Sequence, residues 1–200
     1  MDKTIIFHVE GGIGKNLMAT AVATAIKKAH PDRKLIVCAA WAAVWVNNPD
    51  VDRFYVLGAT PYFFEDFIKG KDTWIFKSEP YHHQDFLNGK RYLADIWCEQ
   101  LGVPYNGEMP QLVLSKNEKK NIERKLSGFG KPIFALQTNG GGPQDFPVSW
   151  VRDVPLSNLT QILNEINREY KIIHIRREDQ PAIKGVDFIQ TPNVRDLFAV

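Results

Sequence analysis

The stretch TIIFHVEGGIGKNLMATAVATAIKK, residues 4–28, decides the fold of the first part of the chain. The β-branched and aromatic run Thr4–Val9 predicts a short buried strand. The glycines of Gly11–Gly14 predict a tight turn, because glycine adopts backbone conformations that other residues avoid. Leu17–Lys28 carries apolar residues at helical spacing and ends on two lysines, which predicts a helix. A strand that enters a helix through a glycine turn is the first unit of an α/β fold.

The same pattern continues along the chain and then starts again. Alternating strands and helices predict a parallel, doubly wound sheet up to Ser127, and a Gly/Pro-rich boundary follows at residues 127–132. Ile133–Gln137 then opens a second strand, glycine turn and helix. We therefore expect an α/β protein of two Rossmann-like domains, at residues 1–127 and 131–200, with the second one cut short. The further expected strands are Lys34–Ala39, Asp52–Leu57, Thr73–Lys77, Lys171–Ile175 and Val186–Ile189, and the further expected helices are Arg91–Leu101, Asn117–Leu126 and Leu156–Tyr170.

The composition excludes several classes of protein. Hydrophobic residues make up 44% and charged residues 24%, which is ordinary for a chain with a folded core. The net charge of +2 is too small for a dedicated nucleic-acid binder. We expect no metal site, since Cys38 and Cys98 have no partners at ligand spacing. No apolar run is long enough to span a bilayer and no signal peptide opens the chain. We therefore expect a cytoplasmic protein, either free or peripheral to the inner face of a membrane.

The first glycine turn allows a nucleotide-binding interpretation. A P-loop needs a glycine five residues before its Gly–Lys pair and a hydroxyl residue after it to bind Mg²⁺. Here Val9 and Asn16 stand at those positions, and a deviant loop of the ParA type also lacks its first lysine, which Glu10 replaces. A deviant P-loop ATPase is therefore the alternative interpretation.

A different family matches more of the chain. Gly11–Gly14 with its helix, His30–Asp32, and Asn48–Arg53 (NPDVDR) resemble the opening of the heptosyltransferases, glycosyltransferase family 9 of the GT-B fold. Lys131–Gln137 and Trp150 are similar to the start of that family's donor domain. The resemblance implies an inverting, metal-independent glycosyltransferase without a cofactor. Its co-substrate would be a nucleotide-diphosphate sugar, its acceptor the hydroxyl of a glycan or lipid-linked sugar, and its site the cleft between the domains.

The chain departs from the family at two places. The family's acceptor-activating aspartate is Lys15 here, and a charged lysine cannot accept a proton. Glu10 is the nearest carboxylate that could replace it. The distal donor motif Asp-(Ser/Thr)-Gly-x-x-His is absent from these residues. Because ligands in open α/β sheets contact the ends of several strands, we expect this chain to bind nucleotide sugars weakly.

The resemblance and the turn positions together assign the candidate residues. Glu10 is interpreted either as the base or as a cap of the turn and helix, and Lys15 either as a phosphate ligand or as a solvated first-turn residue. Arg152, Arg176 and Glu178 could bind the donor or belong to solvated charged surface. The candidate acceptor-binding residues are Gly11, Gly12, Gly14, Tyr81 and His82, and the candidate donor-binding residues are Thr138, Asn139, Gly140, Gly141, Arg152, Arg176 and Glu178.

Overall fold

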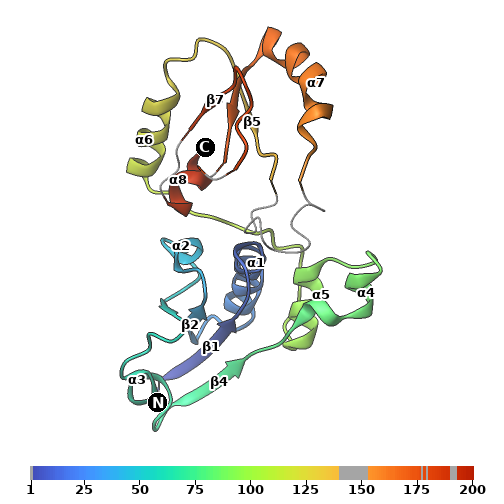
Figure 1. Ribbon diagram of the computed structural model, residues 1–200. Coiled ribbons are helices and arrows are strands. Elements are labelled where there is room, and N and C mark those ends of the chain that lie inside the picture. Colours follow the sequence, from blue (N-terminus) through green and yellow to red (C-terminus); the bar gives the residue numbers. More distant parts are fainter. Residues whose placement is uncertain (1, 140–152, 177, 179, 190–192) are drawn as a thin grey trace. The chain divides into compact units, whose positions relative to one another are not determined.

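The computed structural model describes residues 2–139, 153–176, 178, 180–189 and 193–200. The chain divides into two compact units, Met1–Val113 and Leu114–Val200 (Figure 1). Each unit contains its own parallel β-sheet, with four strands in the first and three in the second. The predicted fold class, an α/β protein with two Rossmann-like units, is confirmed.

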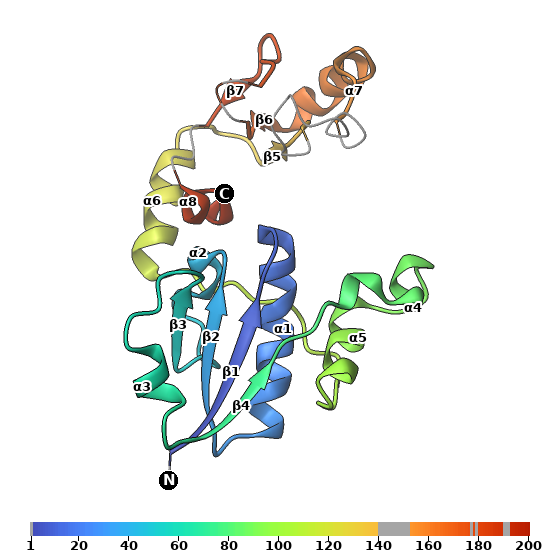
Figure 2. The ribbon, with the colours of Figure 1, turned by 60° about the horizontal axis from the view of Figure 1, so that its bottom comes forward.

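The first unit is built around the sheet β3-β2-β1-β4, whose neighbouring strands all pair in parallel (Figure 2). This order places the first strand in the centre, as a doubly wound sheet requires. The elements of the unit are β1 (Lys3–Val9), α1 (Ile13–Ala29), β2 (Lys34–Ala39), α2 (Ala42–Trp45), β3 (Arg53–Val56), α3 (Phe63–Phe67), β4 (Asp72–Phe76), the 3-10 helix η1 (Pro80–His82), α4 (Gln84–Leu87) and α5 (Leu93–Gln100).

Both faces of β1 are buried, which explains its near-continuous apolar sequence. Phe7 packs edge-on against Trp97 of α5, with ring centroids 5.5 Å apart. Its neighbour Ile6 points to the opposite face, since side chains alternate along a strand, and joins a cluster with Ile36, Cys38 and Phe67 of α3. Helices therefore cover both sides of the central strand.

The second unit has the strand order β5-β6-β7, again in parallel pairs. Leu159 and Leu163 of α7 pack against Ile172 of β6 to form its core. The elements of the unit are α6 (Lys116–Leu126), β5 (Ile133–Leu136), α7 (Leu156–Glu169), β6 (Lys171–His174), β7 (Asp187–Phe188) and α8 (Val194–Ala199).

The structure divides the chain earlier than the glycines at residues 128 and 130 suggest. The predicted boundary places α6 before the second domain, whereas α6 belongs to the second compact unit. Ser115 and Glu118 form a capping box at its start, and Arg195 of α8 donates to both carboxylate oxygens of Glu118, at 2.5 and 2.9 Å. The hydrogen bond from Arg195, together with those from Ser115, lowers the pKa of Glu118 to about 2. This contact between residues 77 positions apart joins α6 to α8, and sequence periodicity cannot reveal it.

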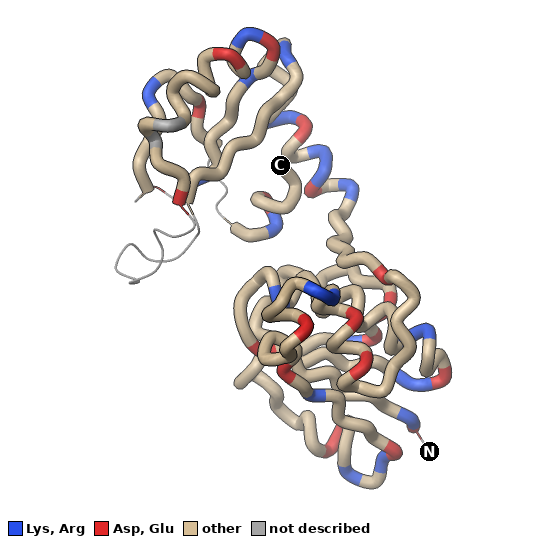
Figure 3. The backbone as a smooth tube through the Cα atoms, turned by 90° about the vertical axis from the view of Figure 1, so that its right-hand side faces the viewer, with Lys and Arg blue, Asp and Glu red and all other residues tan. Residues whose placement is uncertain are grey.

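Charged residues of both signs are spread along the backbone of each unit (Figure 3). Within the described ranges, no helix is long and apolar enough to cross a membrane. In the same ranges, no three His, Cys, Asp or Glu residues gather in a way that could hold a metal ion.

Candidate functional site

A polar pocket of about 340 Å³ lies at the carboxyl ends of β1 and β4 in the first unit. The two strands are parallel neighbours, paired up to Phe7 and Phe76, so the residues that follow them emerge at the same edge of the sheet. The pocket is lined by His8, Glu10, Lys15, Lys77, Ser78 and Glu79. Carboxyl ends of parallel strands are the usual ligand-binding edge of such folds.

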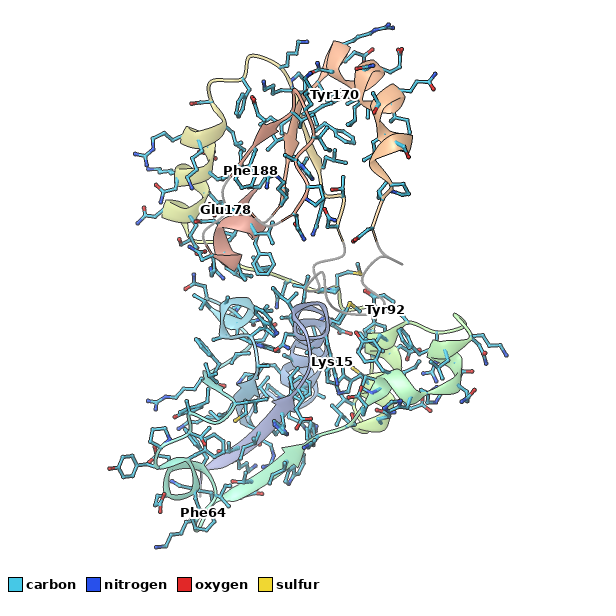
Figure 4. All side chains as sticks on the ribbon, viewed as in Figure 1. Lys15, Phe64, Tyr92, Tyr170, Glu178 and Phe188 are labelled. Carbon is cyan, nitrogen blue, oxygen red and sulfur yellow. The ribbon has the colours of Figure 1, made fainter. Side chains whose placement is uncertain are left out.

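Lys15 is not the solvated first-turn residue that the sequence allows, because its side chain is buried against a carboxylate. It lies in the first turn of α1 (Figure 4), its residue is only 7% exposed, and its Nζ lies 2.5 Å from Oε2 of Glu79. The ammonium group also lies 5.6 Å from the ring centroid of Tyr81 and 5.4 Å from that of Trp97. A buried cation at a helix N-terminus is opposed by the helix dipole and by desolvation. Glu79 and the two aromatic rings offset this cost, so Lys15 is an internal ion-pair residue.

Glu10 is exposed and forms an ion pair with Lys77, at 3.0 Å. The hydrogen bond from Lys77 lowers the pKa of Glu10, so its carboxylate is ionised at neutral pH. The N-cap of α1 is Gly12, and no side chain caps this helix. Glu10 therefore does not take the capping role that the sequence also allows.

Sequence reasoning did not single out His8, Ser78 or Glu79, although all three line the pocket. His8 is the penultimate residue of β1 and Glu10 follows the end of that strand, so a continued strand alternation would place both side chains on one face. Its Nε2 lies 3.6 Å from Oε1 of Glu10. The alternation of side chains could therefore have indicated from the sequence that His8 lies beside Glu10. No comparable signal marks Glu79, because its partner Lys15 lies 64 positions away.

Asn16 occupies the place of the magnesium-binding hydroxyl in a P-loop, and its side chain is already fully engaged. The residue is completely buried, and its Nδ2 donates to the carbonyls of Gly11 and Gly12, at 3.3 and 3.0 Å. Its Oδ1 accepts a hydrogen bond from Nε1 of Trp45, at 3.3 Å. The amide oxygen therefore serves packing, and the geometry gives no support to the P-loop interpretation.

The glycine turn is shorter than predicted, because α1 begins at Ile13 and includes Gly14 and Lys15. Only Gly11 is required by the backbone, with φ at +92°. A Cβ on Gly11 would lie 3.0 Å from Cδ of Lys15, whereas a Cβ on Gly12 or Gly14 would meet no atom within 4 Å. Of the other predicted acceptor residues, Tyr81 contacts Lys15, and His82 is not among the residues that line the pocket.

The second unit has a buried polar pair at the carboxyl ends of β5 and β6. Thr138 and His174 are 2% and 1% exposed, and Oγ1 of Thr138 lies 2.9 Å from Nε2 of His174. Because Thr138 donates its hydroxyl proton to Oδ1 of Asn139, it accepts from the Nε2–H of His174. Nδ1 of His174 is buried and has no hydrogen-bond partner among the described residues.

Of the other residues predicted to bind the donor, Arg176 and Glu178 lie within the described part of the second unit. Arg176 donates to the carbonyls of Glu178 and Gln180, at 3.3 and 3.1 Å, and its guanidinium lies 4.4 Å from the ring centroid of Phe188. Glu178 and Phe188 are labelled in Figure 4. The predictions for Gly140, Gly141 and Arg152 lie outside the described residues.

We expect the second unit to lose stability as the pH falls below about 6.5, the ordinary pKa of histidine. Burial, together with nearby Arg176, lowers the pKa of His174 in the folded state. The unfolded chain then takes up a proton that the folded unit does not, which costs up to about 1.4 kcal/mol per pH unit until the folded pKa is reached. Hydrogen exchange of the β6 amides at pH 7.5 and 5.5 measures this loss.

His174→Leu should abolish that part of the pH dependence, whatever its effect on stability at pH 7.5. Glu118 does not interfere, since its contribution is complete above its unfolded pKa of 4.5 and is lost only as the pH falls from there toward about 2. An equal slope in the parent and in His174→Leu between pH 7.5 and 5.5 would contradict the prediction.

No family model matches the sequence, and no curated protein matches it significantly in sequence. Solved structures do match its fold. A glycosyltransferase family 9 structure from Veillonella parvula has a TM-score of 0.66 at 15% identity, over 88% of this chain and 63% of that one. ADP-heptose LPS heptosyltransferase II from E. coli has a TM-score of 0.56 at 12% identity, over 88% and 65%. The iron-containing dodecameric glycosyltransferase TibC from enterotoxigenic E. coli has a TM-score of 0.52 at 12% identity, over 94% and 47%.

The chain thus spans less than two thirds of the length of each of these structures. The likeness confirms the predicted resemblance in fold to glycosyltransferase family 9. At identities of 12–15% the likeness extends to the fold alone.

Proposed function

We propose that the protein transfers a sugar from a nucleotide-diphosphate sugar to an acceptor hydroxyl. The observation that carries the proposal is the polar pocket at the carboxyl ends of β1 and β4, in a chain with the fold of known glycosyltransferases. A fold alone does not define an activity, which depends on the residues that bind the acceptor and the donor.

The pocket of the first unit suits a polyhydroxylated acceptor, such as a glycan or a lipid-linked sugar. It offers two ammonium groups, two carboxylates and an imidazole within one small volume. Ser78 adds a buried Oγ that has no hydrogen-bond partner among the described residues. A sugar hydroxyl both donates and accepts, so it can pair with either sign of charge and with Ser78. A purely apolar ligand would leave the Ser78 hydroxyl and the His8 imidazole unpaired, at a considerable cost.

The second unit supplies the residues proposed for the donor. Thr138 and Asn139 follow β5, and Arg176 and Glu178 follow β6, so all four stand at the carboxyl ends of neighbouring parallel strands. Guanidinium groups form strong paired contacts with phosphate. We therefore assign the nucleotide-diphosphate sugar to this edge of the second sheet.

The proposed reaction is a single displacement. The acceptor oxygen bonds to the anomeric carbon, the bond from that carbon to the diphosphate breaks, and its electron pair leaves with the nucleoside diphosphate. Positive groups and backbone N–H groups stabilise the negative charge that develops on the diphosphate. This direct attack inverts the anomeric configuration and needs neither a metal ion nor a cofactor.

The proposal is tested by offering ADP-, GDP- and UDP-hexoses at millimolar concentration with a panel of free and lipid-linked sugars. We expect nucleoside diphosphate release that depends on the acceptor, that is unchanged by EDTA, and that yields a product of inverted configuration by NMR. ATP with Mg²⁺ serves as the control substrate. Release that requires Mg²⁺, hydrolysis of ATP, or no transfer with any pair would overturn the proposal.

Substituting Gly12 with valine should impair acceptor binding while leaving the fold intact. Gly12 has φ −74° and ψ 174°, which valine adopts without strain, and an added Cβ would meet no atom within 4 Å. The loss of stability should therefore not exceed the cost of about 1 kcal/mol for a less favourable N-cap residue. Gly12 stands in the turn between the pocket residues Glu10 and Lys15, so a branched side chain there should block close approach and lower acceptor affinity about tenfold, which corresponds to about 1.4 kcal/mol. Calorimetric titration with the best acceptor measures the change.

Gly11→Val is the contrasting variant. At φ +92° and 3.0 Å from Cδ of Lys15, a side chain strains the backbone and displaces the ion-pair lysine. We expect this variant to lose thermal stability. If Gly12→Val binds acceptor as the parent does, the glycines serve only the turn.

A further inference from the structure

His8 differs from every other titratable group that lines the pocket. Both carboxylates already accept hydrogen bonds, Glu10 from Lys77 and Glu79 from Lys15 and from the backbone N–H of Tyr81. His8 makes no hydrogen bond to a described residue, and the 3.6 Å from its Nε2 to Oε1 of Glu10 is too long for one. The imidazole therefore faces the pocket with its proton-accepting capacity unused.

The two carboxylates are poor bases because their partners stabilise the ionised form. Lys77 lowers the pKa of Glu10. Partial burial acts to raise the pKa of Glu79, but the hydrogen bonds from Lys15 and from the Tyr81 backbone outweigh it and lower that pKa as well. A general base works best when its pKa lies near the working pH. The lysines cannot take this part, since each donates to a carboxylate.

We propose that His8 is the general base that accepts the proton of the acceptor hydroxyl, with Glu10 stabilising the imidazolium that forms. The inference rests on the proposed function and deepens it. As the acceptor oxygen bonds to the anomeric carbon, its proton moves to an imidazole nitrogen of His8. The electron pair of the broken carbon–oxygen bond stays on the departing diphosphate. The imidazolium then returns its proton to solvent, so the residue is unchanged after each turnover.

The surroundings of His8 keep it neutral before the reaction and favour its cation afterwards. Burial and the charge of Lys77 lower the pKa of His8, and the carboxylate of Glu10 acts in the opposite direction. Cys38, its register neighbour on β2, is uncharged because burial raises the pKa of its thiol to about 11. Lys15 and Glu79, the other charged groups of the pocket, neutralise each other at 2.5 Å. His8 is thus an unprotonated base at pH 7, beside a carboxylate that can balance the charge it gains.

The test combines an NMR titration of His8 with pH–rate profiles, using the donor and acceptor that give the highest turnover in the screen above. The kcat/KM of the parent protein should rise with pH through the pKa that NMR measures for His8, below 6.5, and reach a plateau by pH 7.5. His8→Gln should lower kcat/KM about 100-fold on that plateau. His30→Gln is the matched control, because His30 lies at the far end of α1.

Two further variants keep the proposal falsifiable if His8→Gln folds poorly. Glu10→Gln removes the charge that raises the pKa of His8, so it should lower that pKa, and Lys77→Met should raise it. In both variants, the pH at which kcat/KM rises should shift together with the pKa of His8 that NMR measures. A rise that stays at the same pH, or transfer by His8→Gln within twofold of the parent, would overturn the assignment of His8. Absence of transfer by the parent protein would instead overturn the proposed function, whatever the NMR titration shows.

Discussion

Replacing Glu79 with glutamine is expected to destabilise the first unit by about 3 kcal/mol, because the buried ammonium group of Lys15 would lose its charged hydrogen-bond partner. The side chain of Lys15 is 8% exposed, so it cannot recover hydration when its partner is neutralised. The rings of Tyr81 and Trp97 stabilise the ammonium group only in part. Urea denaturation followed by tryptophan fluorescence measures the change.

The reciprocal variant separates an internal ion pair from a binding site. Lys15→Met should cost much less than Glu79→Gln, because the side chain of Glu79 is 43% exposed and water can replace its partner. The double variant Lys15→Met with Glu79→Gln should recover most of the stability lost in Glu79→Gln. Equal losses in both single variants would contradict the burial asymmetry that the structure shows.

The elements that local sequence could predict are those with a clear periodicity. The strands Thr4–Val9 and Lys34–Ala39 and the restart at Ile133 were predicted with small errors at their ends, since buried parallel strands read as apolar runs. The short elements α3, η1 and α4 were missed. Each is five residues or fewer and depends on contacts made elsewhere, such as the packing of Phe63 and Phe67 against Tyr55.

The sequence indicated where the candidate pocket lies but not which residues pair in it. The glycine turn after β1 pointed to the edge of the sheet at which the pocket is found, because ligand sites in α/β folds follow the carboxyl ends of strands. Glu10 and Lys15 form ion pairs with Lys77 and Glu79, which follow β4 and lie more than 60 positions further along the chain. No local pattern carries that pairing. His8 was overlooked because its strand read as uniformly apolar.

Asn16 gives the second large effect, and it bears on the alternative that the glycine turn first suggested. Asn16→Ala should destabilise the first unit by about 3 kcal/mol, because it leaves Nε1 of Trp45 buried without an acceptor and removes the donor to two carbonyls. Asn88→Ala is the matched control, an exposed asparagine at the end of α4 in the same unit. Urea denaturation of both variants at pH 7.5 measures the difference.

Asn16→Thr then distinguishes a packing residue from a displaced metal ligand. If this turn were a P-loop, threonine would restore the hydroxyl that ligates Mg²⁺, and ATP binding would become dependent on that ion. The structure predicts the opposite, since the threonine hydroxyl is too short to replace the amide that joins Gly11, Gly12 and Trp45. We expect Asn16→Thr to be destabilised like Asn16→Ala and to bind ATP no better when Mg²⁺ is added. Mg²⁺-dependent ATP binding by this variant in calorimetry would restore the P-loop interpretation. It would also remove the basis for treating the turn as the wall of an acceptor pocket.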